Sequence, residues 1–137
     1  MRIFRVVDEQ GFGYRRRDDN EQCLNSKIDN EACLPFPENY EEIRPLPEDD
    51  GIPSYPAHYL FAFQSIDLLK SWFSLHERNA GTVMGGQIMV IDVPDEHVIL
   101  GRKQCCFDCG MSTLVSCTTM NGFDTPEEQA THYPKWD

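Results

Sequence analysis

Cysteine supplies the most reactive side chains of this chain, and two of the six cysteines stand at a spacing that is typical of metal ligands. Cys106-Phe107-Asp108-Cys109 is a CxxC motif, and tetrahedral zinc favours two such closely spaced pairs. The residues available for a second pair are Cys117 with His132, or Cys23 with Cys33, and neither pair has zinc-finger spacing. The alternative to a zinc site at Cys106 and Cys109 is free thiols, with Cys105 and Cys106 alternating on a strand.

Histidines and glycines give weaker indications of catalysis. The four histidines are scattered without an HExxH or paired spacing, and the chain has no GxSxG nucleophile motif. We keep His58, which directly precedes an apolar segment, as a candidate functional residue. Gly11-Phe12-Gly13 lacks the third glycine and the following helix of a phosphate-binding loop, so we interpret it as a turn.

Acidic residues dominate the charge of this 137-residue chain, in which 23 Asp and Glu oppose 12 Lys and Arg for a net charge of −11. Phosphate binding needs clustered basic residues, and Arg15-Arg16-Arg17 is the one such cluster, so we exclude a nucleic-acid clamp. Short acidic clusters lie between residues 8 and 56, in a segment with six prolines and few aliphatic residues. These carboxylates are either simply solvated or imitate DNA phosphates on a basic partner surface.

Neither a membrane span nor a secretion signal is predicted. No run approaches the roughly 18 apolar residues that cross a bilayer, and the N-terminus lacks the apolar region and cleavage site of a signal peptide. We therefore expect a cytoplasmic protein whose thiols stay reduced.

The candidate residues need a framework, and the apolar runs predict one that is rich in strands. Strands are expected at 2–7, 59–63, 87–93, 98–100, 103–107 and 113–118, where apolar and β-branched residues gather or alternate. The largely apolar run 87–93, closed by Pro94, is typical of a central strand that is buried on both faces.

One main helix is predicted directly after the aromatic strand at 59–63. Ser65 can cap this helix, Asp67 suits its first turn, and Asn79-Ala80-Gly81 is expected to end it. Thr125-Pro126-Glu127-Glu128 predicts the start of a second, short helix that Pro134 limits.

The order of these elements predicts an α+β fold. A single main helix cannot supply the right-handed crossovers of a parallel sheet, so we expect one twisted, mostly antiparallel sheet. A chain of this length supports one core and hence one domain. Within it, residues 58–120 are expected to form the sheet and helix core, residues 8–56 an irregular acidic insertion, and residues 121–137 a C-terminal tail.

Four segments in this order resemble small bacteriophage proteins of unassigned function. They are Ile3-Phe4-Arg5-Val6-Val7, Tyr59 to Ser65 with the helix that ends near Trp72-Phe73, Gly86 to Val93, and Gly101 to Phe107. The same order is loosely similar to the ADP-ribosyltransferase fold of bacterial toxins and of the poly(ADP-ribose) polymerase superfamily. In that fold an Arg or His on the first strand, a Ser or Tyr near an aromatic strand, and a Glu on a late strand surround the nicotinamide end of NAD.

The resemblance implies catalytic positions at Arg5, Ser65 and Gln104. It also implies NAD as the cofactor, held by nearby residues of which we single out His58, Tyr59, Phe63 and Trp72. Gln104 stands where the family has Glu, and a neutral amide can bind the ribose 2′-hydroxyl without supplying the negative charge that stabilises an oxocarbenium-like transition state. Gln104 therefore bears directly on whether the chain can transfer ADP-ribose.

Three hypotheses about function follow. In the first, a phage accessory protein binds NAD or a related nucleotide and modifies a host protein. In the second, a non-catalytic acidic inhibitor, of the anti-CRISPR or another anti-defence type, docks through residues 8–56 onto a host nucleic-acid-binding complex. In the third, Cys106 and Cys109 form part of a zinc-stabilised protein-interaction module.

Overall fold

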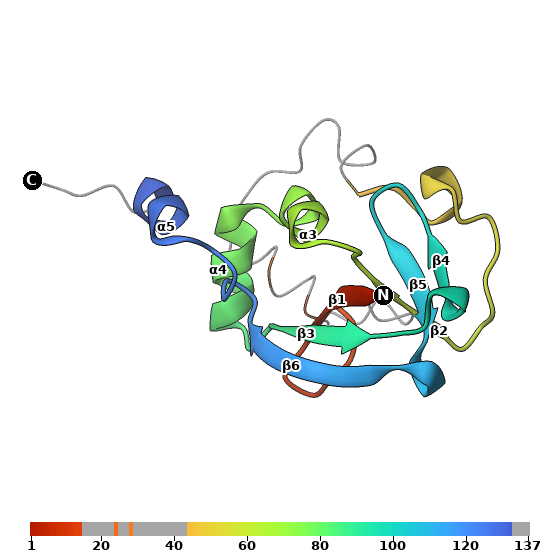
Figure 1. Ribbon diagram of the computed structural model, residues 1–137. Helices are drawn as coiled ribbons and strands as arrows, with labels where there is room; N and C mark the ends of the chain where they lie inside the picture. Colours follow the sequence, from red (N-terminus) through yellow and green to blue (C-terminus); the bar gives the residue numbers. More distant parts are fainter. Residues whose placement is uncertain (15–23, 25–27, 29–43, 133–137) are drawn as a thin grey trace, which may run out of the picture.

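The computed structural model describes residues 1–14, 24, 28 and 44–132, which form an α+β domain with two three-stranded antiparallel sheets (Figure 1). The first sheet contains β1 (Arg2–Val7), β3 (Gln87–Asp92) and β6 (Thr113–Thr119). The second contains β2 (Tyr59–Ala62), β4 (Val98–Leu100) and β5 (Cys105–Asp108). All six predicted strands are present, but the single sheet that the sequence led us to expect is wrong.

β3 is the central strand of the first sheet, between β1 and β6. Its register with β1 pairs Ile91 with Ile3 and Ile88 with Val6. These two pairs lie on opposite faces of the sheet, because side chains alternate along a strand. Each pair belongs to a different buried cluster, so the predicted burial of this strand on both faces is confirmed at these positions.

The two faces of the first sheet cover two different cores. One cluster includes Trp72 and Phe73 and packs the sheet against the helices. The other includes Ala62 of β2 and Phe107 of β5 and packs the first sheet against the second. The first sheet is therefore the layer that the two cores share.

The two sheets are joined by one short bridge between β1 and the end of β2. The Phe4 amide donates to the Phe63 carbonyl, and the Phe63 amide donates to the Phe4 carbonyl, both at 2.8 Å. Through this bridge the strands follow one continuous order, β4-β5-β2-β1-β3-β6. β1, β2 and β5 are thus consecutive neighbours, and the three predicted catalytic positions lie on these strands or at their ends.

The predicted main helix is two helices, α3 (Ile66–Trp72) and α4 (Leu75–Val83). Ser65 caps α3 as expected, since its Oγ accepts from the Leu68 amide at 3.1 Å. Phe73 is extended, and Ser74 then starts α4 with a reciprocal capping box to Glu77. The prediction overlooked this second start because the apolar stripe continues across the break.

Gly81 lies inside α4, so the prediction that Asn79-Ala80-Gly81 ends the helix is wrong. A Cβ atom at Gly81 would lie 2.1 Å from Met120 Sδ, and Met120 is fully buried directly after β6. The glycine therefore allows the close approach of α4 to the sheet rather than a helix end.

The expected C-terminal helix is α5 (Pro126–His132), and a buried ion pair fastens the chain that leads into it. Arg78 Nε donates to Asp124 Oδ1 at 2.9 Å, and the two side chains are only 5% and 1% exposed. Lys70 Nζ donates to Glu128 at 2.8 Å. This hydrogen bond, together with one from the Thr125 amide, lowers the pKa of Glu128 to about 2. The described residues after 121 therefore pack against α3 and α4.

The Pro-rich segment contributes to the core as well as covering it. Leu24, Ile28 and Ile52 are each at most 1% exposed, although few aliphatic residues flank them in the sequence. Arg44 Nε donates to the Trp72 carbonyl at 2.9 Å, and Asp50 ends a short 3-10 helix (Glu48–Asp50) with its side chain buried. Two further 3-10 turns span Asp95–His97 and Cys109–Met111.

No helix within the described part of the chain combines the length and apolar character that a bilayer span requires.

Candidate functional site

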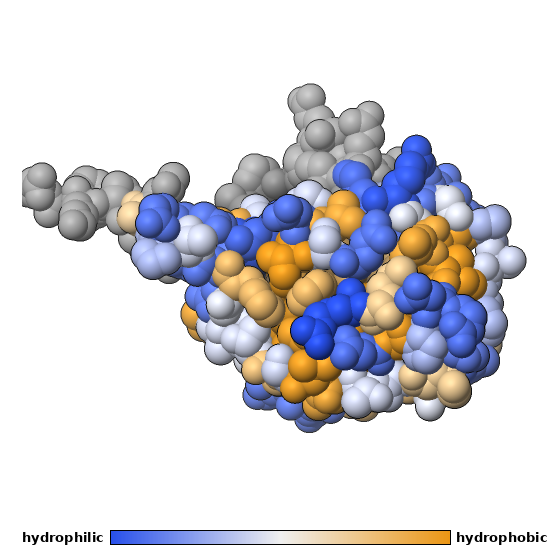
Figure 2. All heavy atoms as spheres, in the orientation of Figure 1, coloured by the Kyte–Doolittle hydropathy of each residue, from blue (hydrophilic) through white to orange (hydrophobic). Residues whose placement is uncertain are grey.

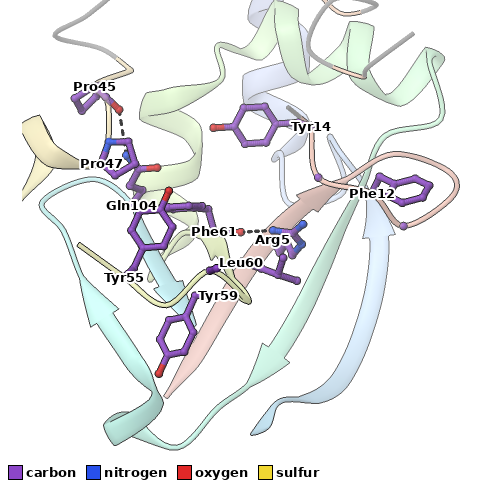
Figure 3. Close-up of a pocket in the computed structure, with 13 residues that line it drawn as sticks. Arg5, Phe12, Tyr14, Pro45, Pro47, Tyr55, Tyr59, Leu60, Phe61 and Gln104 are labelled. Carbon is purple, nitrogen blue, oxygen red and sulfur yellow. Dashed lines mark hydrogen bonds between the residues drawn. The ribbon is translucent and has the colours of Figure 1, made fainter. Parts of the chain in front are cut away.

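An open pocket of about 770 Å³ lies between β2, the turn that follows β1, and the Pro-rich segment (Figure 3). This volume falls within the range of roughly 300–1,000 Å³ that is usual for small-molecule sites. The pocket is lined by Arg5, Gly11, Phe12, Gly13, Tyr14, Pro45, Pro47, Tyr55, Ala57, Tyr59, Leu60, Phe61 and Gln104.

Arg5 is the one charged residue among the described residues that line this pocket. It lies on β1, partly buried, and its Nη1 donates to the Phe61 carbonyl at 2.7 Å. Burial lowers the pKa of Arg5 from its ordinary value, although a guanidinium stays charged at neutral pH.

Arg5 differs from the buried arginines Arg44 and Arg78 in having no acidic partner among the described residues. Arg44 pairs with Glu77 and Arg78 pairs with Asp124, whereas Arg5 forms no ion pair with any described residue. A partly desolvated cation without a counter-ion is costly. It is especially unexpected in a chain of net charge −11, in which carboxylates are plentiful.

Aromatic rings form much of the pocket wall. Tyr55 and Phe61 meet edge to face with ring centroids 5.0 Å apart, and Tyr14 meets the core residue Phe73 in the same way at 5.1 Å. Phe12 is 54% exposed at the pocket. Such rings can stack on a planar ligand, and each stacked base is worth roughly 1–3 kcal/mol in nucleic-acid complexes.

The turn that carries Phe12 is held in place by Asp8. Asp8 Oδ1 accepts from the amides of Gln10 and Phe12, both at 2.9 Å. Gly11 between them has a φ of +88°, which an L side chain rarely adopts. The turn predicted at Gly11-Phe12-Gly13 is therefore present, and its three residues line one side of the pocket.

Gln104 lies in the pocket wall directly before β5 and is buried. Its Nε2 donates to the Pro45 carbonyl at 3.1 Å, and its backbone amide donates to Asp50 Oδ2 at 2.9 Å. Asp50 also accepts from the Lys103 amide, so this buried carboxylate holds the whole β4–β5 loop. Gln104 Oε1 has no donor among the described residues, which leaves it able to accept a hydrogen bond from a ligand.

The structure brings together three of the seven residues that the resemblance singled out. Arg5, Gln104 and Tyr59 line one pocket. The other four do not line it: they are Ser65, which caps α3; Phe63 and Trp72, which pack together in the helix-side core; and His58, which is exposed beside Asp108 at 3.6 Å.

Sequence reasoning missed the aromatic residues Phe12, Tyr14, Tyr55 and Phe61 as components of the pocket. One usable signal was that Tyr14 and Tyr55 are large apolar rings within a polar, Pro-rich segment. Such rings seldom remain unburied unless they meet a core or a ligand.

The CxxC cysteines face different environments. Cys106 is buried on β5, where burial raises the pKa of its thiol to about 11, while Cys109 is exposed. Cys105 is buried as well, with a thiol pKa raised to about 12. Among the described residues no group of three or more Cys, His, Asp and Glu is placed to hold a metal, and zinc at Cys106 and Cys109 stays a prediction.

Comparison with known protein families gives a match over most of the chain. The family model described as Bacteriophage T4 Y00F protein matches residues 1–121. No curated protein and no solved structure gives a significant match.

Proposed function

Because this chain belongs to the bacteriophage T4 Y00F protein family, we propose that it is a phage accessory protein whose pocket binds NAD or a related nucleotide. The observation that carries this proposal is Arg5, a partly buried guanidinium without an acidic partner among the described residues, set in an aromatic pocket. A ligand that is both anionic and planar satisfies both features of the site.

Each part of a nucleotide finds a suitable group in the pocket. A phosphate can accept charge-assisted hydrogen bonds from Arg5, and a base or nicotinamide ring can stack on Tyr55, Tyr59 or Phe12. Gln104 Oε1 can accept from a ribose hydroxyl. Phosphate and ring together explain why one cation and several aromatic residues share a single pocket.

The residues that line the pocket favour nucleotide binding over transfer of ADP-ribose. Ser65 Oγ lies outside the pocket lining and is occupied by the Leu68 amide. None of the described residues that line the pocket is Asp or Glu, so the negative charge that would stabilise an oxocarbenium-like transition state is missing there. We therefore expect nucleotide binding with little or no ADP-ribose transfer to a host protein.

Calorimetry with NAD, ADP-ribose, AMP and nicotinamide tests the proposal. Loss of charge-assisted hydrogen bonds worth about 1.5–3 kcal/mol predicts that Arg5→Met weakens binding of the phosphate-bearing ligands by about 10- to 150-fold. Arg2→Met is the matched control, since Arg2 is an exposed β1 residue paired with Asp92. No binding of any ligand at millimolar concentration, or equal binding by wild type and Arg5→Met, would refute the proposal.

A labelled-NAD assay separates binding from transfer. Host lysate is incubated with the protein and biotinylated NAD, and modified proteins are sought by mass spectrometry. We expect none above the level seen without the protein. A protein whose modification disappears with Arg5→Met would establish transfer and contradict the binding-only interpretation.

A second candidate function is the docking of exposed acidic residues onto a basic host surface. It is supported by the burial of two arginines, which removes positive charge from the surface. Arg44 and Arg78 are buried in ion pairs, which leaves acids such as Glu48, Asp49 and Glu96 exposed. A host partner captured at low salt and lost at moderate salt, equally by wild type and Arg5→Met, would favour this function. Capture that persists in high salt would count against it.

A further inference from the structure

β6 is the exposed edge of the first sheet. β3 is its one partner among the described strands, and six of its seven residues are exposed. In Figure 1 it runs along the outer side of the sheet, with β3 between it and β1. Its outward N–H and C=O groups therefore form an open row that another strand can pair with.

β6 lacks the charged side chains and prolines that usually prevent an edge strand from pairing with another strand. The sequence from Cys109 to Phe123 contains no Asp, Glu, Lys, Arg or Pro, although about a quarter of the chain is charged. Leu114 is 55% exposed and Val115 is 45% exposed. Figure 2, in the same orientation, shows pale and orange residues along the lower front, where β6 lies.

One β-bulge limits which residues can pair. The register with β3 shifts between Val90, which faces Ser116, and Ile91, which faces Leu114. Val115 is therefore the extra residue, and the regular ladder runs from Ser116 to Thr119. A partner strand can align with these four residues without meeting the bulge.

We propose that β6 pairs antiparallel with β6 of a second copy of this chain, joining the two first sheets into one six-stranded sheet. The distribution of charge favours a second copy as the partner of β6. Two copies with a net charge of −11 repel each other over most of their surfaces, and an uncharged edge is where they can touch without opposing carboxylates. The same edge offers no attraction to a basic partner.

Two-fold symmetry also gives acceptable side-chain pairs across the new ladder. Opposite residues must share a face of the sheet, so the axis passes through a residue position. Centring it on Thr118 places Thr118 opposite Thr118 of the second copy and Cys117 opposite Thr119. All three side chains are small and uncharged. The short ladder implies a weak dimer, with a dissociation constant on the order of 100 µM.

Sedimentation equilibrium from about 5 to 500 µM tests the proposal. We expect a concentration-dependent mass that rises from 15.8 kDa toward twice that value. Cys117→Lys places a charge on the edge and is expected to weaken the dimer at least about tenfold. Val83→Lys, which adds the same charge at a 68% exposed position at the end of α4, should leave the dimer unchanged. A monomer at all concentrations, or a dimer that Cys117→Lys does not weaken, would overturn the proposal.

A crosslinking experiment keeps the proposal testable if Cys117→Lys fails to fold. A short bismaleimide should couple Cys117 of the two copies in the wild-type protein, because both cysteines are exposed and lie on adjacent strands of the dimer. Cys109→Ser should retain this crosslink and Cys117→Ser should abolish it. A crosslinked dimer that persists in Cys117→Ser would show that a different face associates.

Discussion

Replacing Arg5 by methionine is expected to change the free energy of unfolding by less than about 1 kcal/mol, in contrast to the same change at Arg78. Arg5→Met removes the 2.7 Å hydrogen bond to the Phe61 carbonyl, a loss of about 1–3 kcal/mol if that oxygen stays unpaired. It also removes the cost of holding a guanidinium in a partly buried position without a counter-ion. The two effects have opposite signs and similar size.

Arg78→Met removes the guanidinium and leaves the buried carboxylate of Asp124 without its main partner. The Asp124 side chain is 1% exposed and would lose its contacts with Arg78 Nε and Nη2, while Lys70 Nζ, at 3.6 Å, offers partial compensation. Breaking a buried ion pair from one side costs about 3–5 kcal/mol, and Lys70 places this case near the lower end, at about 3 kcal/mol. Arg2→Met, which breaks an exposed pair, should cost at most about 1 kcal/mol.

Urea denaturation with linear extrapolation measures all three variants against wild type, with unchanged slopes expected because the folded surface stays the same. The informative quantity is the difference of at least about 2 kcal/mol between Arg78→Met and Arg5→Met. If Arg5→Met destabilises the protein by about 3 kcal/mol or more, Arg5 is a structural residue. The inference that its charge is kept for a ligand then fails.

Two further predictions concern stability. Gly81→Ala should gain about 1 kcal/mol of stability from helix propensity but lose about 1–3 kcal/mol because the new methyl group forces Met120 aside. We therefore expect a lower urea midpoint. A higher midpoint would contradict the close packing of α4 on Met120. The pKa of Glu128 is about 2 in the folded protein, against an ordinary value of 4.5. Glu128 therefore stabilises the fold above pH 4.5, and this stabilisation is lost as the pH falls toward 2. Lys70→Met should flatten this part of the melting-temperature profile, and an unchanged profile would refute the role of Lys70.

The strands could be predicted because their signals are local. Alternation in 2–7, the aromatic run at 59–63 and the apolar run at 87–93 each indicate a strand without knowledge of its neighbours. The helix break could also have been read, because Ser74-Leu75-His76-Glu77 has the spacing of a capping box. The division into two sheets has no local signal, since it depends on which strands pair.

The pocket was only partly predictable for the same reason. Arg5 and Gln104 were singled out through a resemblance, and the strand order places both on one cavity. The aromatic wall combines Phe12 and Tyr14, which follow β1, with Tyr55 and the β2 residues Tyr59 and Phe61, which are about 40 residues later in the sequence. Leu24 and Ile28 illustrate the same limit, because isolated aliphatic residues in a polar segment do not reveal that they are buried.

The ion pair between Arg78 and Asp124 shows that the end of the family match is not the end of the folded part of the chain. The family similarity ends at residue 121, but the carboxylate that neutralises the buried Arg78 lies three residues later. A chain cut where the similarity ends would retain every strand and both main helices and still leave a cation buried without its partner. The stretch that the family model matches is therefore shorter than the stretch whose buried charges pair with each other.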